Sequence, residues 1–181
     1  RDGRLSFWAV AERRDWQRVA DAYGDPESGI PIVRDNTVVF PAIVDELTYI
    51  GAEAVERDIA GTKHALEAAG KPVSDGFVAA ISPGSAARVA NAFYEDDEAV
   101  VWACADVLRE EYKRITDAGL TVQIDAPDIA EGWDQMNPEP SVEDYRAFSR
   151  VRIDALNHAL EGIDPDLVRF HVCWGSWHGP H

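Results

Sequence analysis

The chain has few cysteines, few basic residues and no long apolar segment, and each shortage excludes a class of protein. Two cysteines in 181 residues are too few for a disulfide framework, so we expect a reducing, cytoplasmic environment. Seventeen Lys and Arg against 33 Asp and Glu give a net charge of −16, which argues against binding a nucleic-acid backbone. No apolar run approaches the roughly 20 residues of a membrane span. These features favour a cytoplasmic enzyme that acts on small molecules.

Helical and strand-like patterns alternate along the sequence. Helices are predicted over residues 51–70, 96–118 and 141–162, and strands over residues 73–82, 120–125 and 167–173. A less clearly bounded strand is predicted within residues 37–50. Strand and helix in alternation predict an α/β fold with a parallel sheet.

The length constrains how much of an α/β barrel the chain can contain. A complete (β/α)₈ barrel typically needs about 250 residues, and this chain has 181. It begins at Arg1 without a start methionine or signal peptide, and it ends at His181, just after a segment rich in histidine and tryptophan. We therefore interpret residues 1–181 as one domain of the (β/α)₈ type, an incomplete barrel truncated at both ends.

Polar residues stand where each predicted strand finishes. Ser82 ends the first strand, Asp125 the second, and His171 and Cys173 the third. Ligands bind at the carboxyl ends of the strands in α/β barrels and open α/β sheets. We expect one site at this edge, although strands also end wherever polar residues begin.

The His171–Val172–Cys173 tripeptide is a candidate zinc site. Side chains two apart on a strand share a face, and an imidazole nitrogen and a thiolate both suit Zn²⁺. The alternative is that both are ordinary core residues. Two ligands do not complete a zinc shell, and the remaining ligands are expected beyond residue 181. His178 and His181 are further possible ligands or surface residues, and Cys104 is expected to be a buried core residue.

Asp125 is the candidate catalytic and substrate-binding residue. A carboxylate at this strand end suits an ammonium group on a substrate, and the alternative role is capping of a helix or turn at residues 126–129. The following segment is interpreted as a loop that contains Glu131, Asp134 and Gln135, of which the two carboxylates add negative charge. Nearby aromatic residues could stack on a planar ring or pack at the rim; they are Trp133, Trp174 and Trp177. Two groups of basic residues are expected to be solvated helix faces: Arg146, Arg150 and Arg152, and Arg109, Lys113 and Arg114.

Three segments together resemble the cobalamin-independent methionine synthase family, and in particular single-barrel relatives of its C-terminal catalytic domain. They are residues 81–84 (ISPG), 122–127 (VQIDAP) and 170–175 (FHVCWG). They occur in the family's order and approximate spacing, and the resemblance covers roughly residues 37–181.

The resemblance implies a (β/α)₈ barrel, a catalytic zinc, and methyl transfer from a methyltetrahydropteroylpolyglutamate to the thiol of homocysteine. It implies that His171 and Cys173 are zinc ligands, that Asp125 holds the amino group of homocysteine, and more loosely that Ser82 lines the folate side. The sequence departs from the family at Ala126, where a glutamate is usual, and in lacking the Gly-Ser-Phe-Pro segment. Two alternatives therefore stay open: alkyl transfer to another thiol, as in the related epoxyalkane:coenzyme M transferase, and a non-catalytic barrel remnant.

Overall fold

Three parallel strands in the order β2–β4–β5 form the main sheet of the computed structural model, which describes residues 14–18 and 42–173. The strands are β2 (Phe77–Ile81), β4 (Thr121–Asp125) and β5 (Val168–His171), and a separate parallel pair joins β1 (Ala42–Ile43) to β3 (Ala90–Asn91). The helices are α1 (Arg14–Arg18), α3 (Ala52–Ala68), α4 (Pro83–Ala86), α5 (Asp97–Asp117), α6 (Pro127–Gln135) and α7 (Val142–Ala159), with short 3₁₀ turns at Val73–Asp75 and Pro165–Leu167.

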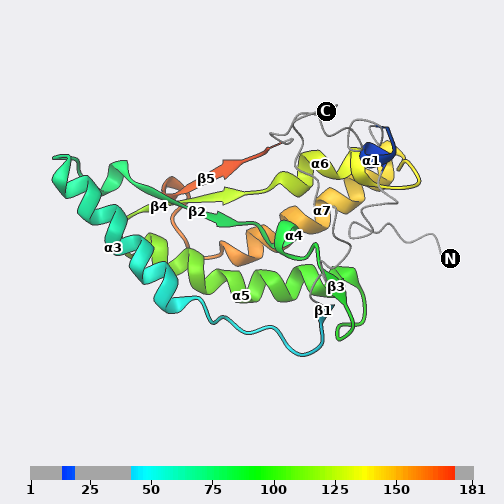
Figure 1. Ribbon diagram of the computed structural model, residues 1–181, viewed down its shortest axis with the longest axis horizontal. Coiled ribbons are helices and arrows are strands. Elements are labelled where there is room, and N and C mark those ends of the chain that lie inside the picture. The colour runs from blue at the N-terminus through cyan, green and yellow to red at the C-terminus, as the bar shows by residue number, and fades with distance from the viewer. Residues whose placement is uncertain (1–13, 19–41, 174–181) are drawn as a thin grey trace, which may run out of the picture.

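One face of the main sheet carries the core. Val122 and Ile124 of β4 are fully buried and pack with α3, α5 and α7, whose contributions include Ile59, Ile115 and Ala159. Figure 1 shows α5 and α7 running beneath the strands on this side. Because side chains alternate along a strand, residues 121, 123 and 125 of β4 point to the opposite face.

The opposite face of the main sheet is left accessible. Phe77 and Ile81 of β2 are each 44% exposed, and the side chains of Asp125 and His171 are 41% and 47% exposed. Large apolar side chains that remain in water are unfavourable by about 25 cal/mol per Å². This face therefore exposes both apolar side chains and the polar side chains of Asp125 and His171 to solvent.

The helix ends follow from capping residues that the sequence displays. Ser141 and Asp96 precede α7 and α5, and their side chains accept hydrogen bonds from the backbone N–H groups of Asp144 and Ala99. Gly70, Gly119 and Gly162 follow α3, α5 and α7 with positive φ angles of 64°, 81° and 79°. Each glycine turns the chain from a helix toward the next strand, as a left-handed helix C-terminus requires.

The α/β class, the parallel sheet and the three long helices agree with the sequence analysis. The described residues contain parts of a parallel sheet and no complete eight-stranded barrel. None of the helices in this part of the chain is both long enough and apolar enough to cross a membrane. The strand expected within residues 37–50 is only Ala42–Ile43 where the structure describes it, and residues 37–41 lie outside the described ranges.

Three predictions of element type or bounds were wrong. The strand expected from residue 73 begins only at Phe77, after the 3₁₀ turn at Val73–Asp75. The segment after Asp125 is helix α6 rather than a loop, so Glu131, Asp134 and Gln135 lie on a helix. Pro127 starts this helix because its missing N–H is not needed in the first turn. The last strand ends at His171, so Cys173 lies two residues past it.

Candidate functional site

The strand register brings Asp125 and His171 side by side at the carboxyl edge of the sheet. Ile81, Asp125 and His171 are cross-strand neighbours in the last row of the β2–β4–β5 ladder. Two further backbone bonds hold this edge, from Ser82 N to Asp125 O and from Ala126 N to His171 O, both at 2.9 Å. The structure therefore brings the side chains of Asp125 and His171 together at one edge of the sheet, as expected from the sequence.

Asp125 and His171 are in direct contact. His171 Nδ1 lies 2.8 Å from Asp125 Oδ1, and Gln123 Nε2 donates to the same oxygen at 3.1 Å. No side chain caps the N-terminus of α6, where Ala126 is the capping residue, so Asp125 does not serve as the turn cap considered above. Within the described residues, Oδ2 of Asp125 takes part in no hydrogen bond, so this oxygen can accept a hydrogen bond from a ligand.

Arg169 completes a row of polar side chains on the same face. Its Nη1 donates to Gln123 Oε1 at 3.4 Å, and its guanidinium lies 4.4 Å from the centre of the Phe77 ring. A guanidinium is a donor only, so it fixes which end of the Gln123 amide faces it. Arg169, Gln123, Asp125 and His171 thus form one connected chain across β4 and β5.

His171 and Cys173 offer two donors to a metal. The Nδ1 atom of His171 faces Asp125, which leaves Nε2 as the nitrogen able to bind a cation. Cys173 is not part of a disulfide and has intermediate exposure. Nitrogen and sulfur donors fit zinc, but no group of three or more potential ligands occurs among residues 14–18 and 42–173. His178 and His181, like Trp174 and Trp177, lie outside the described residues.

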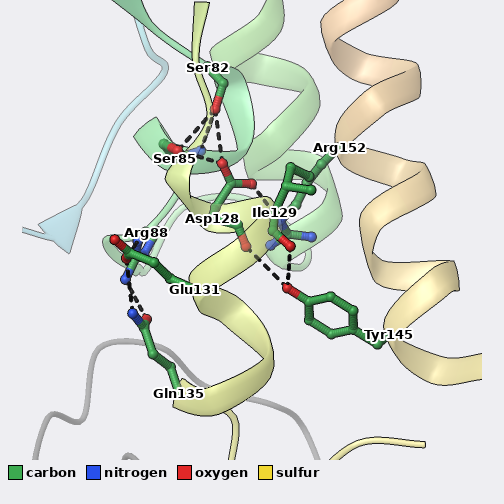
Figure 2. A network of polar contacts seen from close by, with 9 residues as sticks. All are labelled: Ser82, Ser85, Arg88, Asp128, Ile129, Glu131, Gln135, Tyr145 and Arg152. Carbon is green, nitrogen blue, oxygen red and sulfur yellow. Dashed lines mark hydrogen bonds and ion pairs between the residues drawn. The ribbon is translucent and has the colours of Figure 1, made fainter. Parts of the chain in front are cut away.

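Ser82 belongs to a buried polar network on the other side of the sheet edge, shown in Figure 2. Ser82 is 3% exposed and caps α4 by accepting a hydrogen bond from Ser85 N. Its hydroxyl lies 3.0 Å from Ser85 Oγ and donates to Asp128 Oδ1 at 3.0 Å, and the Ser85 hydroxyl reaches the same oxygen at 2.5 Å. The predicted substrate role of Ser82 stays a prediction, and in this structure its hydroxyl is engaged by Ser85 and Asp128.

Arg152 supplies the positive charge of this network. Its Nε lies 3.4 Å from Asp128 Oδ2, its side chain is only 11% exposed, and its guanidinium covers the Phe148 ring at 3.3 Å. Burial lowers the pKa of Arg152 to about 10, while Asp128 acts in the opposite direction, so the guanidinium stays charged at neutral pH. The expectation that Arg152 lies on a solvated helix face is therefore wrong, whereas Arg146 and Arg150 are exposed as predicted.

A second layer of contacts fixes α6. Arg88 pairs with Glu131 at 3.2 Å and donates to Gln135 at 2.5 Å, and Tyr145 of α7 donates to the carbonyl oxygen of Ile129 at 2.6 Å (Figure 2). These contacts anchor the helix that begins immediately after Asp125 and so hold the end of β4 in place.

Gln123 and Asp128 were not predicted from the sequence as site residues. Gln123 stands two residues before Asp125, a spacing that puts both on one strand face, and this signal could have identified it. Asp128 gives no comparable signal, because its partners come from α4 and α7, far away in the sequence.

Comparisons with known proteins identify no relative. The chain matches no protein-family model, no curated protein and no solved structure.

Proposed function

We propose that this chain takes part in zinc-dependent transfer of a methyl group from 5-methyltetrahydropteroylpolyglutamate to the thiol of homocysteine, giving methionine. The observation that carries the proposal is the contact of Asp125 with His171 at the carboxyl edge of a parallel sheet, with Cys173 two residues further on. We propose in addition that the β2–β4–β5 sheet is part of a (β/α)₈ barrel. Its long helices α5 and α7 lie on one face, as the helices of such barrels do, and Asp125 and His171 lie at the carboxyl ends of its strands, where the active sites of such barrels are found.

The residues of this chain would hold the metal and the acceptor. His171 through Nε2 and Cys173 through Sγ would supply two ligands. When bound, zinc would lower the pKa of the acceptor thiol, which then reacts as a thiolate. The Oδ2 atom of Asp125 would accept a hydrogen bond from the ammonium group of homocysteine and so orient the acceptor.

The balance of the reaction is simple. A carbon–nitrogen bond of the donor breaks and a carbon–sulfur bond forms, while the acceptor's thiol proton leaves before the transfer and the donor nitrogen takes up a proton. No oxidant or reductant is needed.

Alkyl transfer to coenzyme M is the second candidate reaction, and the position of Arg169 favours it. Its guanidinium lies on the same face as Asp125 and would suit the sulfonate of coenzyme M. Asp125 argues for the amino-acid acceptor, because a carboxylate attracts ammonium and repels sulfonate. Comparing homocysteine with coenzyme M as acceptors separates the two reactions.

The test is made on the full-length protein with Cys173 and Cys104 as a matched pair. We expect wild type to contain zinc by elemental analysis and to form methionine, measured by mass spectrometry. Cys173→Ala should lose both. Cys104→Ala is the control, because Cys104 is 6% exposed within α5 and should leave zinc and activity in place. Wild-type protein without zinc, or Cys173→Ala with its zinc retained, would contradict the proposal.

Asp125→Asn tests the acceptor. With the ammonium contact weakened, KM for homocysteine should rise when the variant is assayed at a zinc concentration that saturates it. An unchanged KM would show that Asp125 does not bind the amino group.

A further inference from the structure

Two histidines face carboxylates at hydrogen-bond distance, and they do so through different ring nitrogens. His171 presents Nδ1 to Asp125 at 2.8 Å, whereas His158 presents Nε2 to Asp106 at 2.7 Å. The Nδ1 atom of His158 also lies 4.0 Å from Glu161 Oε1, beyond hydrogen-bond distance. An ionised carboxylate only accepts hydrogen bonds, so the nitrogen that faces it carries the hydrogen. A neutral His171 ring therefore has its proton on Nδ1 and a lone pair on Nε2, and a neutral His158 ring has the reverse. Free histidine in water prefers the proton on Nε2, so the arrangement at His171 needs a cause.

The carboxylate of Asp125 is itself held in place. Gln123 donates to Oδ1, the same oxygen that His171 faces, and Arg169 donates to the carbonyl oxygen of Gln123. Because the guanidinium occupies the oxygen end of the Gln123 amide, the nitrogen end must point to Asp125. The face of the Phe77 ring packs against the guanidinium of Arg169. Three strands thus contribute to one fixed orientation of a single carboxylate oxygen.

We propose that Asp125 is a positioning residue for His171: it fixes the proton on Nδ1 and presents Nε2 as the metal-binding nitrogen, while Gln123 and Arg169 aim its carboxylate. This rests on the proposed function in that the metal is taken to be zinc. It adds a second task for Asp125, which one residue can perform because Oδ1 serves His171 and Oδ2 serves the acceptor. Metal-binding histidines commonly donate their other N–H to a carboxylate in this way.

The first test needs no metal. In metal-free, ¹⁵N-labelled full-length protein at alkaline pH, where imidazole rings are neutral, two-bond nitrogen–proton correlations report the tautomer of each ring. We expect the proton of His171 on Nδ1 and that of His158 on Nε2. Asp125→Ala should return His171 to the Nε2–H form, and Asp125→Asn, which keeps the shape, should give a mixture. Asp106→Ala is the matched control and should leave His171 unchanged. Wild-type His171 with its proton on Nε2 would overturn the proposal.

The second test measures zinc affinity by competition with a chelator, without substrate. Loss of such a supporting partner typically weakens metal binding by about 10- to 100-fold, and we expect this for Asp125→Ala. Gln123→Met, which removes the donor and keeps the length, should weaken it less, and Asp106→Ala should not weaken it. Equal affinities for wild type and Asp125→Ala would refute the positioning role. Wild-type protein that binds no zinc but shows the expected tautomer would refute the proposed function and leave the role of Asp125 toward His171 standing.

Discussion

Replacing Asp128 by alanine should unfold the protein at much lower urea concentrations. Asp128 is 1% exposed and accepts hydrogen bonds from two buried hydroxyls, those of Ser82 and Ser85, while Arg152 pairs with its second oxygen at 3.4 Å. Alanine leaves a guanidinium with an 11% exposed side chain without this counter-charge. Removing one partner of a buried ion pair typically costs about 3–5 kcal/mol. With a urea dependence of about 2 kcal/mol per molar, the unfolding midpoint should fall by about 2 M.

A surface ion pair provides the control for this experiment. Glu56 and Arg114 lie 3.1 Å apart with side chains 57% and 37% exposed, so Glu56→Ala should cost less than about 1 kcal/mol. The double variant Asp128→Ala with Arg152→Met should be more stable than Asp128→Ala alone, because no buried charge is left behind. Midpoints are measured by urea titration with tryptophan fluorescence. If Asp128→Ala costs no more than Glu56→Ala, the buried network does not stabilise the fold as argued.

Three further predictions use other parts of the structure. Gly84→Ala should destabilise the protein, because a Cβ there would lie 2.2 Å from a carboxylate oxygen of the buried network. In Gly61→Ala the added Cβ in α3 meets nothing within 4 Å, so this variant should raise the free energy of unfolding by about 1 kcal/mol. Thermal melts that rank the two variants the other way would contradict this. Burial raises the pKa of Tyr112, so the unfolded chain loses this proton first as the pH rises above about 10. The free energy of unfolding should therefore fall there more steeply in wild type than in Tyr112→Phe. Urea midpoints that change equally in the two proteins from about pH 9 to 11 would argue against it. Burial raises the pKa of Cys104 to about 11, so a thiol reagent at neutral pH should modify Cys173 quickly and Cys104 only after unfolding. Rapid modification of both cysteines in the folded protein would show that Cys104 is accessible.

The pairing of Asp125 with His171 was predictable because it depends on a simple rule. Both residues end strands of a parallel sheet, and the carboxyl ends of parallel strands lie at one edge. The choice of ring nitrogen was not predictable, since it depends on the position of a single carboxylate oxygen to within a fraction of an ångström. The same holds for Gln123, whose amide orientation is set by Arg169 on the next strand.

The buried network was missed for a different reason. An arginine on a helix such as α7 is usually solvated, and only a tertiary contact with Asp128 overrides that expectation for Arg152. The role of Asp128 was not predicted because the segment that begins at Pro127 was interpreted as a loop. Proline both stops helices and begins them, and the sequence around it does not distinguish the two outcomes here.

The strand register has a consequence for how this protein tolerates insertions and deletions. Ile81, Asp125 and His171 share a row, so removing one residue within β4 would exchange the two faces of that strand, burying Gln123 and Asp125 against the helices and exposing Val122 and Ile124. The turns at Gly70, Gly119 and Gly162 precede the strands and leave this register untouched. Length variation should therefore accumulate at these three glycine turns and be absent from the strands, a pattern that a library of single-residue insertions and deletions would make visible.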